Sequence, residues 1–176
     1  ICEANERDHV VAMLLINLGG FKSINDSFGH ATGDNLLKLA SLRLHQNLRS
    51  SDLFGRFSGD QFIVLLRDMS EFEDAGYVAR KLIAALSEPL RKEHVTLKLG
   101  ASIGIALQSE SLSDFDSLLR AADGAMHAAK ESGRNTFHYY SQDVLLRAQR
   151  RLELEQALEG ALEREEFTLV YQPLVN

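Results

Sequence analysis

The sequence has only one cysteine, Cys2, in a chain of 176 residues. A single cysteine excludes a disulfide within the chain and a metal site built from several thiolates, and it is typical of a protein from a reducing compartment. No apolar run approaches the length of about 20 residues that a membrane-spanning helix needs, and no secretory signal opens the chain. We therefore expect a cytoplasmic domain without a membrane segment in this stretch.

An excess of positive charge is also missing. Lys and Arg together number 19 against 25 Asp and Glu, which gives a formal net charge of −6. A general nucleic-acid binder needs a basic face, so this balance argues against that class. The initiator methionine is missing too, because the chain opens on Ile1 and Cys2. We expect a piece of a longer protein, in which a sensing or membrane-anchoring part can lie outside this stretch.

The most informative feature that is present is a polar turn between two short apolar strands. Residues 52–57 form an extended run, residues 58–61 are polar, and residues 62–66 are too few for a helix and rich in strand formers. Gly59 can adopt the positive φ that a tight hairpin turn needs. A hairpin tip with bare N–H groups beside the Asp60 carboxylate suits a phosphate and its metal ion. In an isolated hairpin, Asp60 would more simply be a turn residue.

The rest of the chain alternates between strand-like runs and amphipathic helical patterns. We predict strands at residues 10–18, 95–107 and 136–140, and helices at residues 21–28, 35–48, 72–90 and 115–132. The predicted buried stripe of the second helix consists of Leu36, Leu37, Leu39, Ala40, Leu42 and Leu48. A hairpin among alternating elements excludes an all-parallel sheet. We therefore predict an α+β (mixed α/β) domain with helices covering the sheet.

Three smaller features refine this prediction. Gly100 and Gly104, inside the strand pattern of residues 95–107, indicate a bulge or close packing. Asp114 is a predicted N-cap for the last helix. The domain is expected to end near Tyr140. Residues 141–164 then have helical spacing and predict a connecting helix, and residues 165–176 contain one strand, which is too little to fold alone.

Three stretches of the sequence resemble the GGDEF domain, the diguanylate cyclase family of bacterial cyclic-di-GMP signalling. They are FKSINDSFGHATGDNLL at 21–37, RSSDLFGRFSGDQFIVLL at 49–66 and AADGAMHAAKESGRN at 121–135, in the family's order and spacing. The tail at 151–176 is similar to the entry into an EAL domain, the cyclic-di-GMP phosphodiesterase partner. The resemblance implies a nucleotidyl-cyclase or polymerase-palm-like, mostly antiparallel sheet, a C-terminal linker helix and a homodimer.

What is known of the family makes the departures in this chain informative. Two GTP molecules are joined by attack of a 3′-hydroxyl on an α-phosphorus, with Mg²⁺ bridging phosphate oxygens. By the resemblance, the two acids that hold Mg²⁺ fall on Asn17 and Asp60, with the backbone carbonyl of Leu18 as a further ligand. Because an amide brings no negative charge, the resemblance predicts a weakened Mg²⁺ site. The tip departs from the family twice more, at Ser58 and Gln61, within the motif Ser58-Gly59-Asp60-Gln61-Phe62.

The residues that match the family's nucleotide contacts are retained, in contrast to one of the two metal ligands. Asn25 and Asp34 match positions that read guanine, where a carboxylate accepts two neighbouring N–H donors and an amide donates to the carbonyl side. Without the resemblance, both would be interpreted as helix caps. Lys22, Lys130 and Arg134 match basic residues that meet the phosphates, whereas by themselves they would be solvated surface charges.

A second site is implied ahead of the hairpin. Arg49 and Asp52 match the family's inhibitory RxxD motif, which binds a dimer of cyclic-di-GMP, and a guanidinium and a carboxylate both suit that ligand. The simpler interpretation is an exposed ion pair of little consequence.

Three hypotheses about function remain open from the sequence. The first, which we favour, is a degenerate GGDEF domain that binds GTP or cyclic-di-GMP and regulates an attached EAL domain. The second is an active diguanylate cyclase with a modified metal site. The third is a dimerisation scaffold that binds no nucleotide. We favour the first because the base and phosphate contacts are kept while one of the two metal ligands has lost its charge.

Overall fold

A computed structural model of the chain describes residues 10–69, 73–92, 95–97 and 99–140. The predicted connecting helix at 141–164 and the predicted strand within 165–176 lie outside these residues. In chain order the elements are β1 (Val10–Gly19), α2 (Phe21–Phe28), α3 (His30–Gln46), β2 (Leu53–Ser58), β3 (Gln61–Met69), α4 (Glu73–Ser87), β4 (Leu90–Lys92), β5 (Val95–Leu97), β6 (Gly100–Leu107), α5 (Phe115–Glu131) and β7 (Thr136–Tyr140). No helix in the described ranges is long and apolar enough to cross a membrane.

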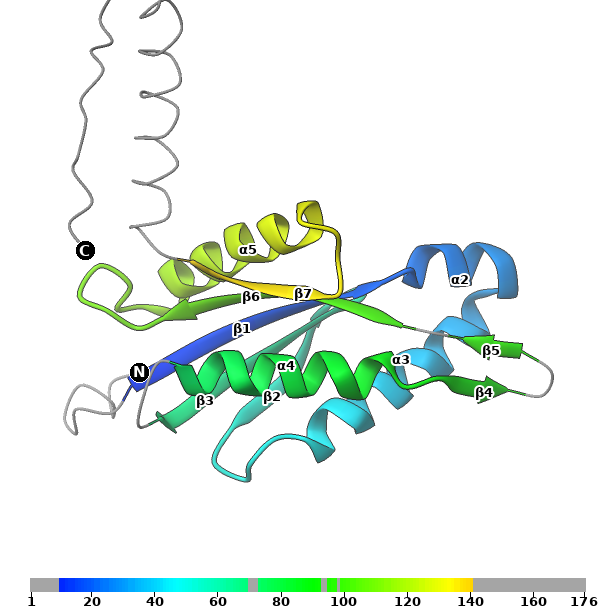
Figure 1. The fold of residues 1–176 in the computed structure, drawn as a ribbon, viewed down its shortest axis with the longest axis horizontal. Coiled ribbons are helices and arrows are strands. Elements are labelled where there is room, and N and C mark those ends of the chain that lie inside the picture. The colour runs from blue at the N-terminus through cyan, green and yellow to red at the C-terminus, as the bar shows by residue number, and fades with distance from the viewer. Residues whose placement is uncertain (1–9, 70–72, 93–94, 98, 141–176) are drawn as a thin grey trace, which may run out of the picture. The chain divides into compact units, whose positions relative to one another are not determined.

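The main sheet has five strands in the order β2-β3-β1-β6-β7 (Figure 1). Strand β1 lies at its centre and is antiparallel to both β3 and β6. Strand β7 runs parallel to β6 and forms one edge. The prediction of a mixed α/β domain with a mostly antiparallel sheet is therefore confirmed.

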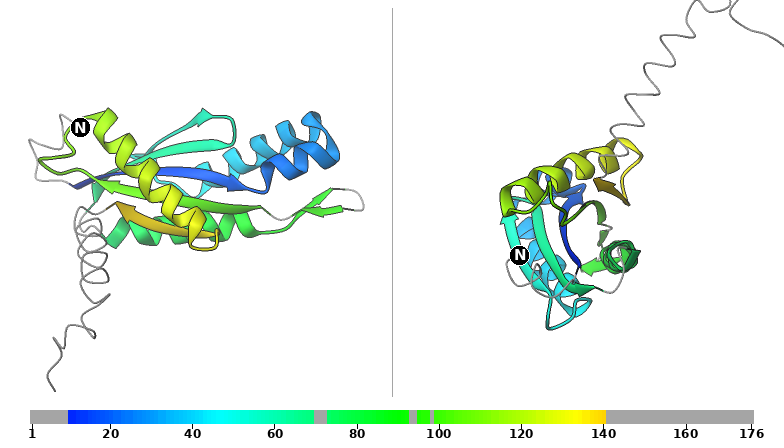
Figure 2. Two further views of the ribbon diagram at one scale, coloured as in Figure 1. Left: turned by 90° about the horizontal axis from the view of Figure 1, so that it is seen from above. Right: turned by 90° about the vertical axis from the view of Figure 1, so that its left-hand side faces the viewer.

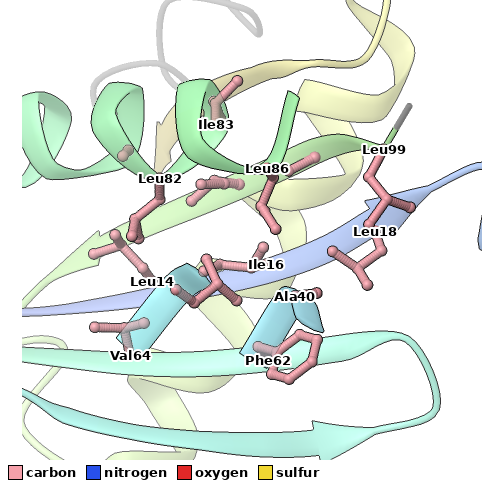
Figure 3. Close-up of a cluster of buried hydrophobic side chains, with 14 of the residues drawn as sticks. Leu14, Ile16, Leu18, Ala40, Phe62, Val64, Leu82, Ile83, Leu86 and Leu99 are labelled. Carbon is pink, nitrogen blue, oxygen red and sulfur yellow. The ribbon is translucent and has the colours of Figure 1, made fainter. Parts of the chain in front are cut away.

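Helices cover both faces of this sheet, with α5 on one face and α3 and α4 on the other (Figure 2). Strand β1 is buried on both faces, as its uninterrupted apolar run predicts. Leu14, Ile16 and Leu18 pack with side chains of α3, α4 and β3 (Figure 3). Met13 and Leu15 point to the opposite face and pack with α5. The alternation fixes which face each residue at the end of β1 uses.

Two features hold α5 in its place. The predicted N-cap is confirmed, because an Asp114 carboxylate oxygen accepts a 2.7 Å hydrogen bond from the backbone N–H of Ser117. This hydrogen bond holds the pKa of the Asp114 carboxyl below its ordinary value. The predicted close packing at Gly104 is also confirmed, because a Cβ there would overlap the Ala122 carbonyl oxygen and the Met126 backbone nitrogen. Helix α5 therefore lies directly against the backbone of β6.

The sequence prediction was wrong about the start and the buried face of α3. This helix begins at His30 rather than at residue 35, because the backbone at Gly33 packs closely on α2 and continues the helix there. Leu39 and Leu42 were predicted to be buried, but they are 37% and 53% exposed. The buried positions recur at intervals of three or four residues, and Leu39 and Leu42 fall outside that stripe. The buried positions are Gly33, Leu36, Leu37, Ala40 and Leu44.

The region after α4 also differs from the prediction. Residues 95–107 were predicted as one strand, but β5 ends at Leu97 and β6 begins at Gly100. Leu90, predicted to end the preceding helix, instead begins β4, which pairs with β5 as a separate two-stranded sheet. Alternating polar and apolar residues are expected in both arrangements, so periodicity did not separate the small hairpin from the central strand.

Candidate nucleotide-binding site

The end of β1 aligns three polar side chains across the sheet. Asn17 is paired with Gln61 of β3 on one side and with Ser102 of β6 on the other. Paired residues of antiparallel strands project from the same face. Here it is the face that α5 covers, because Leu15, two residues earlier, belongs to the same cluster as Met126. All three side chains are uncharged, so amides and a hydroxyl occupy this row.

The hairpin tip is held by hydrogen bonds on both sides of its turn. Gly59 has a φ of +50°, which confirms the predicted left-handed turn position. Its carbonyl oxygen accepts hydrogen bonds from Nε and Nη2 of Arg56 at 3.0 and 2.7 Å. The carbonyl oxygen of Asp60 accepts a hydrogen bond from the Leu18 backbone N–H at 3.0 Å. These bonds keep Asp60 beside the end of β1.

The two residues that depart from the family pattern at the tip bond to each other. The Ser58 hydroxyl donates to Oε1 of Gln61 across the turn, at an oxygen-to-oxygen distance of 3.1 Å. Both groups are neutral, so this contact closes the hairpin end without adding a charge. Among residues 58–61, which form the turn, Asp60 has the one ionisable side chain.

A cleft of about 320 Å³ opens between the hairpin tip, the end of β1, the start of α2 and the end of α5. It brings together six of the predicted site residues, which come from four separate parts of the chain. These are Asn17, Leu18, Lys22, Asp60, Lys130 and Arg134. The three cations among them form no hydrogen bond or ion pair with another side chain in the described ranges, so their charge is available to a ligand.

The position of Arg134 depends on an unusual backbone. Gly133, Arg134 and Asn135 have successive φ values of +112°, +60° and +51°. A left-handed conformation is unfavourable for residues with a Cβ, so such positions persist only where other contacts fix them. Here Oδ1 of Asn135 accepts hydrogen bonds from the Ala101 backbone N–H at 3.3 Å and from the Ser87 hydroxyl at 3.1 Å. These contacts hold the loop that brings Arg134 to the cleft.

A second cavity, of about 400 Å³, lies between α3 and the hairpin. Asp34 lines it, as do Lys38 and Ser41 of α3, Arg56 of β2 and Phe62 of β3. The Phe62 ring is 1% exposed and is stacked on Phe54, with ring centroids 5.8 Å apart and planes 9° from parallel. The Asp34 carboxylate in this cavity suits a base that has N–H donors on its edge.

Asn25, the other predicted base contact, lines neither of these two cavities. Its side chain packs against Gly33, where a Cβ would overlap Asn25 Oδ1. That oxygen is buried and has no hydrogen-bond partner among the described residues. Buried acceptors are usually paired, so the amide is a group whose bonding a ligand or a water molecule would complete. The structure thus brings Asp34 to the cavity and leaves Asn25 packed beneath the α2–α3 junction.

The predicted second site lies at the other end of the β2–β3 hairpin. Asp52 Oδ2 accepts a 2.8 Å hydrogen bond from the Arg49 backbone N–H, and the Asp52 N–H donates back to the Arg49 carbonyl at 3.0 Å. The two residues are therefore joined by a tight turn rather than by an ion pair of their side chains. The crevice they share with Arg67 and Tyr77 is only about 30 Å³. A cyclic dinucleotide there would lie against the surface.

The donor set in the cleft is poorer than that of an Mg²⁺ site with two carboxylates. Mg²⁺ is usually bound by one or two carboxylates together with phosphate oxygens and water. Asp60 is the one carboxylate that lines this cleft, and its neighbour Asn17 supplies only an amide. Within the described ranges, no group of three or more His, Cys, Asp or Glu side chains is arranged to hold a metal ion.

Sequence reasoning missed three residues at these sites. Ser102 is buried at 2% exposure and lines the cleft, and a lone polar residue within an apolar strand was a signal for it. Arg56 clasps the hairpin turn and lines the second cavity, but no local pattern in the sequence indicated that role. Arg67 donates a hydrogen bond to the Ser51 carbonyl at 2.8 Å and adds a second arginine to the crevice of Arg49.

Comparisons with known proteins point to one family. The family model described as "Diguanylate cyclase, GGDEF domain" matches residues 1–136. The chain is 37% identical over 165 residues to the cyclic di-GMP phosphodiesterase NbdA of Pseudomonas aeruginosa, covering 94% of this chain and 21% of that protein. It is 37% identical over 175 residues to the bifunctional diguanylate cyclase/cyclic di-GMP phosphodiesterase MucR of the same species, covering 99% of this chain and 25% of that protein. The chain thus spans about a fifth to a quarter of the length of these relatives.

Solved structures agree with the family match. The crystal structure of the GGDEF domain of TpbB from P. aeruginosa has a TM-score of 0.76 and 38% identity, covering 80% of this chain and 88% of that chain. The active GGEEF domain of a diguanylate cyclase from Vibrio cholerae has a TM-score of 0.74 and 26% identity, covering 80% of this chain and 89% of that chain. The TM-scores show that both solved structures share the arrangement of sheet and helices of this chain.

Proposed function

Because the chain belongs to the GGDEF family of cyclic-di-GMP signalling proteins, we propose that it is a degenerate member that binds guanine nucleotide with little or no turnover. In this proposal the bound nucleotide regulates an EAL phosphodiesterase domain that follows in the full-length protein. The observation that carries the proposal is the cleft at the end of β1, which has three cations for phosphate and a single carboxylate.

The base-binding part of the proposal rests on the cavity beside α3. Asp34 would accept the two N–H donors of a guanine edge, while Phe62 and Leu37 provide an apolar wall. Lys22, Lys130 and Arg134 would then meet the phosphates in the neighbouring cleft, because guanidinium and ammonium groups bind phosphate oxygens strongly. Asn25 is proposed as a base contact from the resemblance alone, because its side chain lines neither cavity. The lining of the two cavities supports the roles proposed for Asp34 and for the three cations.

The regulatory part of the proposal draws support from the relatives. NbdA is named as a cyclic di-GMP phosphodiesterase and MucR as a bifunctional enzyme, and this chain aligns with part of each. We propose the same tandem arrangement here, with residues 141–164 as the connecting helix and residues 165–176 as the start of the EAL domain. A homodimer is also proposed, since two GGDEF domains face each other in cyclisation.

Arg49 and Asp52 are proposed to bind cyclic-di-GMP at a separate site. The guanidinium of Arg49 is exposed and has no ion-pair partner among the described residues. Arg67 also lines the crevice, so a second guanidinium lies close to Arg49. The site lies about 15–20 Å from the hairpin tip, because five strand residues at about 3.3 Å each separate them. The two ligands would therefore bind independently.

A second candidate function is that of an active diguanylate cyclase. It is favoured by the presence of Asp60 in the cleft and by the 39% identity, over 135 residues, to the diguanylate cyclase TpbB. In that case Asp60, the Leu18 carbonyl and the nucleotide phosphates would together hold Mg²⁺, on which cyclases of this family depend. The neutral row of Asn17, Gln61 and Ser102 argues for the regulatory role instead.

Calorimetric titrations test the two proposed binding sites. We expect the chain to bind both GTP and cyclic-di-GMP, and Asp34→Ala to weaken GTP binding by about 10–100-fold, the loss of a hydrogen-bonded charge. Arg49→Ala should weaken only cyclic-di-GMP binding. Asp26→Ala is the matched control, because Asp26 is an exposed aspartate of α2 that lines neither cavity. Absence of binding to both ligands would support a scaffold that binds no nucleotide.

A further inference from the structure

The charges that line the cleft at the end of β1 are unbalanced in favour of cations. Lys22 extends from α2, Lys130 from the last turn of α5 and Arg134 from the loop that follows. Asp60 is the single carboxylate among the lining residues. Three positive groups around one negative group form an attractive site for a polyanion even before any counter-ion binds.

The sheet beneath the cleft adds no negative charge. Asn17 and Ser102 line it, and Gln61 is paired with Asn17 on the other side. A row of acids in this place would repel a triphosphate, and a divalent cation would have to offset that repulsion. Amides and a hydroxyl do not repel phosphate, and they can donate hydrogen bonds to its oxygens.

The backbone at the start of α2 also favours the binding of an anion in this cleft. Gly19 and Gly20 line the cleft, and α2 begins without a side-chain cap or an acidic residue in its first turn. The first N–H groups of a helix have no partner within the helix and favour an anion. Here they lie in the same cleft as the three cations, so backbone and side chains offer complementary donors.

We propose that this cleft binds the polyphosphate of a guanine nucleotide directly, through Lys22, Lys130 and Arg134, and that this binding needs no divalent metal. The inference rests on the proposed function, from which it takes the identity of the ligand. Asp60 then opposes binding, because it is a like charge beside the phosphates rather than a metal ligand. Metal-free GTP is accordingly a full ligand of this domain.

The first test compares GTP affinity with and without metal. The chain is titrated calorimetrically with GTP in EDTA and in excess Mg²⁺, and the two dissociation constants are expected to agree within about threefold, a difference of less than one kcal/mol. Inorganic tripolyphosphate should displace GTP in EDTA, because the same cations hold both. Binding that is more than about tenfold tighter in Mg²⁺ would overturn the inference and leave the proposed function standing.

The second test asks whether removing the charge of Asp60 strengthens or weakens GTP binding. Asp60→Asn keeps the size of the side chain and is expected to tighten GTP binding in EDTA by about two- to fivefold, because a like charge is removed. A metal ligand would behave in the opposite way, and weaker binding of Asp60→Asn in Mg²⁺ would contradict the inference. If GTP binds the unaltered chain in neither buffer, both the inference and the proposed function fail.

Two further variants act as controls. Asn17→Asp restores a second carboxylate and should weaken GTP binding in EDTA by about tenfold while making it respond to Mg²⁺. Lys130→Gln removes one cation and should weaken binding equally in both buffers. Equal thermal midpoints for the variants and the unaltered chain would show that these differences arise in the cleft and not from unfolding.

Discussion

Single residues decide the chemistry at the end of β1. The hairpin pattern indicated Asp60, and the family resemblance added Asn17, Lys22, Lys130 and Arg134. The structure brings all five to one cleft. Their types could be read from the sequence because each lies within a recognisable motif or, for Asn17, shortly before one. Their mutual proximity could not, because it depends on how β1, the hairpin and α5 meet.

Arg56 is the residue whose role was invisible in the sequence. It lines the proposed base cavity, and its guanidinium donates two hydrogen bonds to the Gly59 carbonyl. The neighbouring carbonyl, of Asp60, is held by Leu18 of β1. Arg56 therefore connects the cavity proposed for the base to the turn that carries Asp60. A change in the position of one should change the position of the other.

Replacement of Arg56 by Lys tests this connection. A lysine keeps the charge but cannot make the planar, two-pronged contact with Gly59, so the turn should lose its fixed position. We expect GTP to bind about 3–10-fold more weakly, which corresponds to a net hydrogen-bond contribution of about 0.5–1.5 kcal/mol. Calorimetric titration measures the change, and Arg120→Lys on the exposed surface of α5 is the control.

The thermal midpoint shows whether Arg56→Lys acts by moving the turn or by destabilising the whole domain. Arg56 is exposed, so Arg56→Lys should leave the thermal midpoint close to that of the unaltered chain. A GTP affinity unchanged within about twofold would show that Arg56 has no part in nucleotide binding, given ordinary titration precision.

At the scale of elements, the close contact of α5 with β6 keeps Lys130 and Arg134 over the sheet. A Cβ at Gly104 would overlap backbone atoms of α5 at Ala122 and Met126. The helix would have to move away, and its C-terminal cations would move with it. The strand glycine is thus required by packing and not by its own dihedral angles.

Gly104→Ala should therefore be destabilising. We expect a loss of about 1–3 kcal/mol in the free energy of unfolding, the usual cost of overpacking a core. Gly124→Ala is the matched control, because Gly124 lies within α5 with nothing near its Cβ position. There the same substitution should stabilise the chain by about 0.4–1 kcal/mol.

Urea denaturation of the two variants provides the comparison. We expect the midpoints to move in opposite directions, downward for Gly104→Ala and upward for Gly124→Ala. If Gly104→Ala matched or exceeded the stability of the unaltered chain, α5 could not lie as close to β6 as the structure has it.

Much of the element order was predictable because each element has a clear periodic pattern. The central strand, the hairpin, α2, α5 and β7 follow the predicted ranges closely. The errors arose where packing, rather than local pattern, decides. Gly33 allows α3 to begin early against α2, and the β4–β5 hairpin interrupts a stretch whose alternation looked continuous.

At the scale of the whole molecule, the chain carries a net charge of −6, yet its cleft gathers cations. An acidic protein repels free nucleotide at long range, so the local cations must supply the attraction, and salt should weaken it. The proposed cyclic-di-GMP site lies at the other end of the same hairpin, as Arg49 and Asp52 precede β2. The fold thus separates the two proposed nucleotide sites along one supersecondary unit.

The central claim is that this domain still binds guanine nucleotide but has lost, at Asn17, a negative charge that metal-assisted cyclisation requires. The most direct measurement is to incubate the chain with GTP and either Mg²⁺ or Mn²⁺ and to separate the nucleotides by chromatography. We predict that GTP is recovered intact and that cyclic-di-GMP stays at the background of a protein-free control. Accumulation of cyclic-di-GMP over many turnovers per chain would contradict the claim and identify the domain as a working diguanylate cyclase.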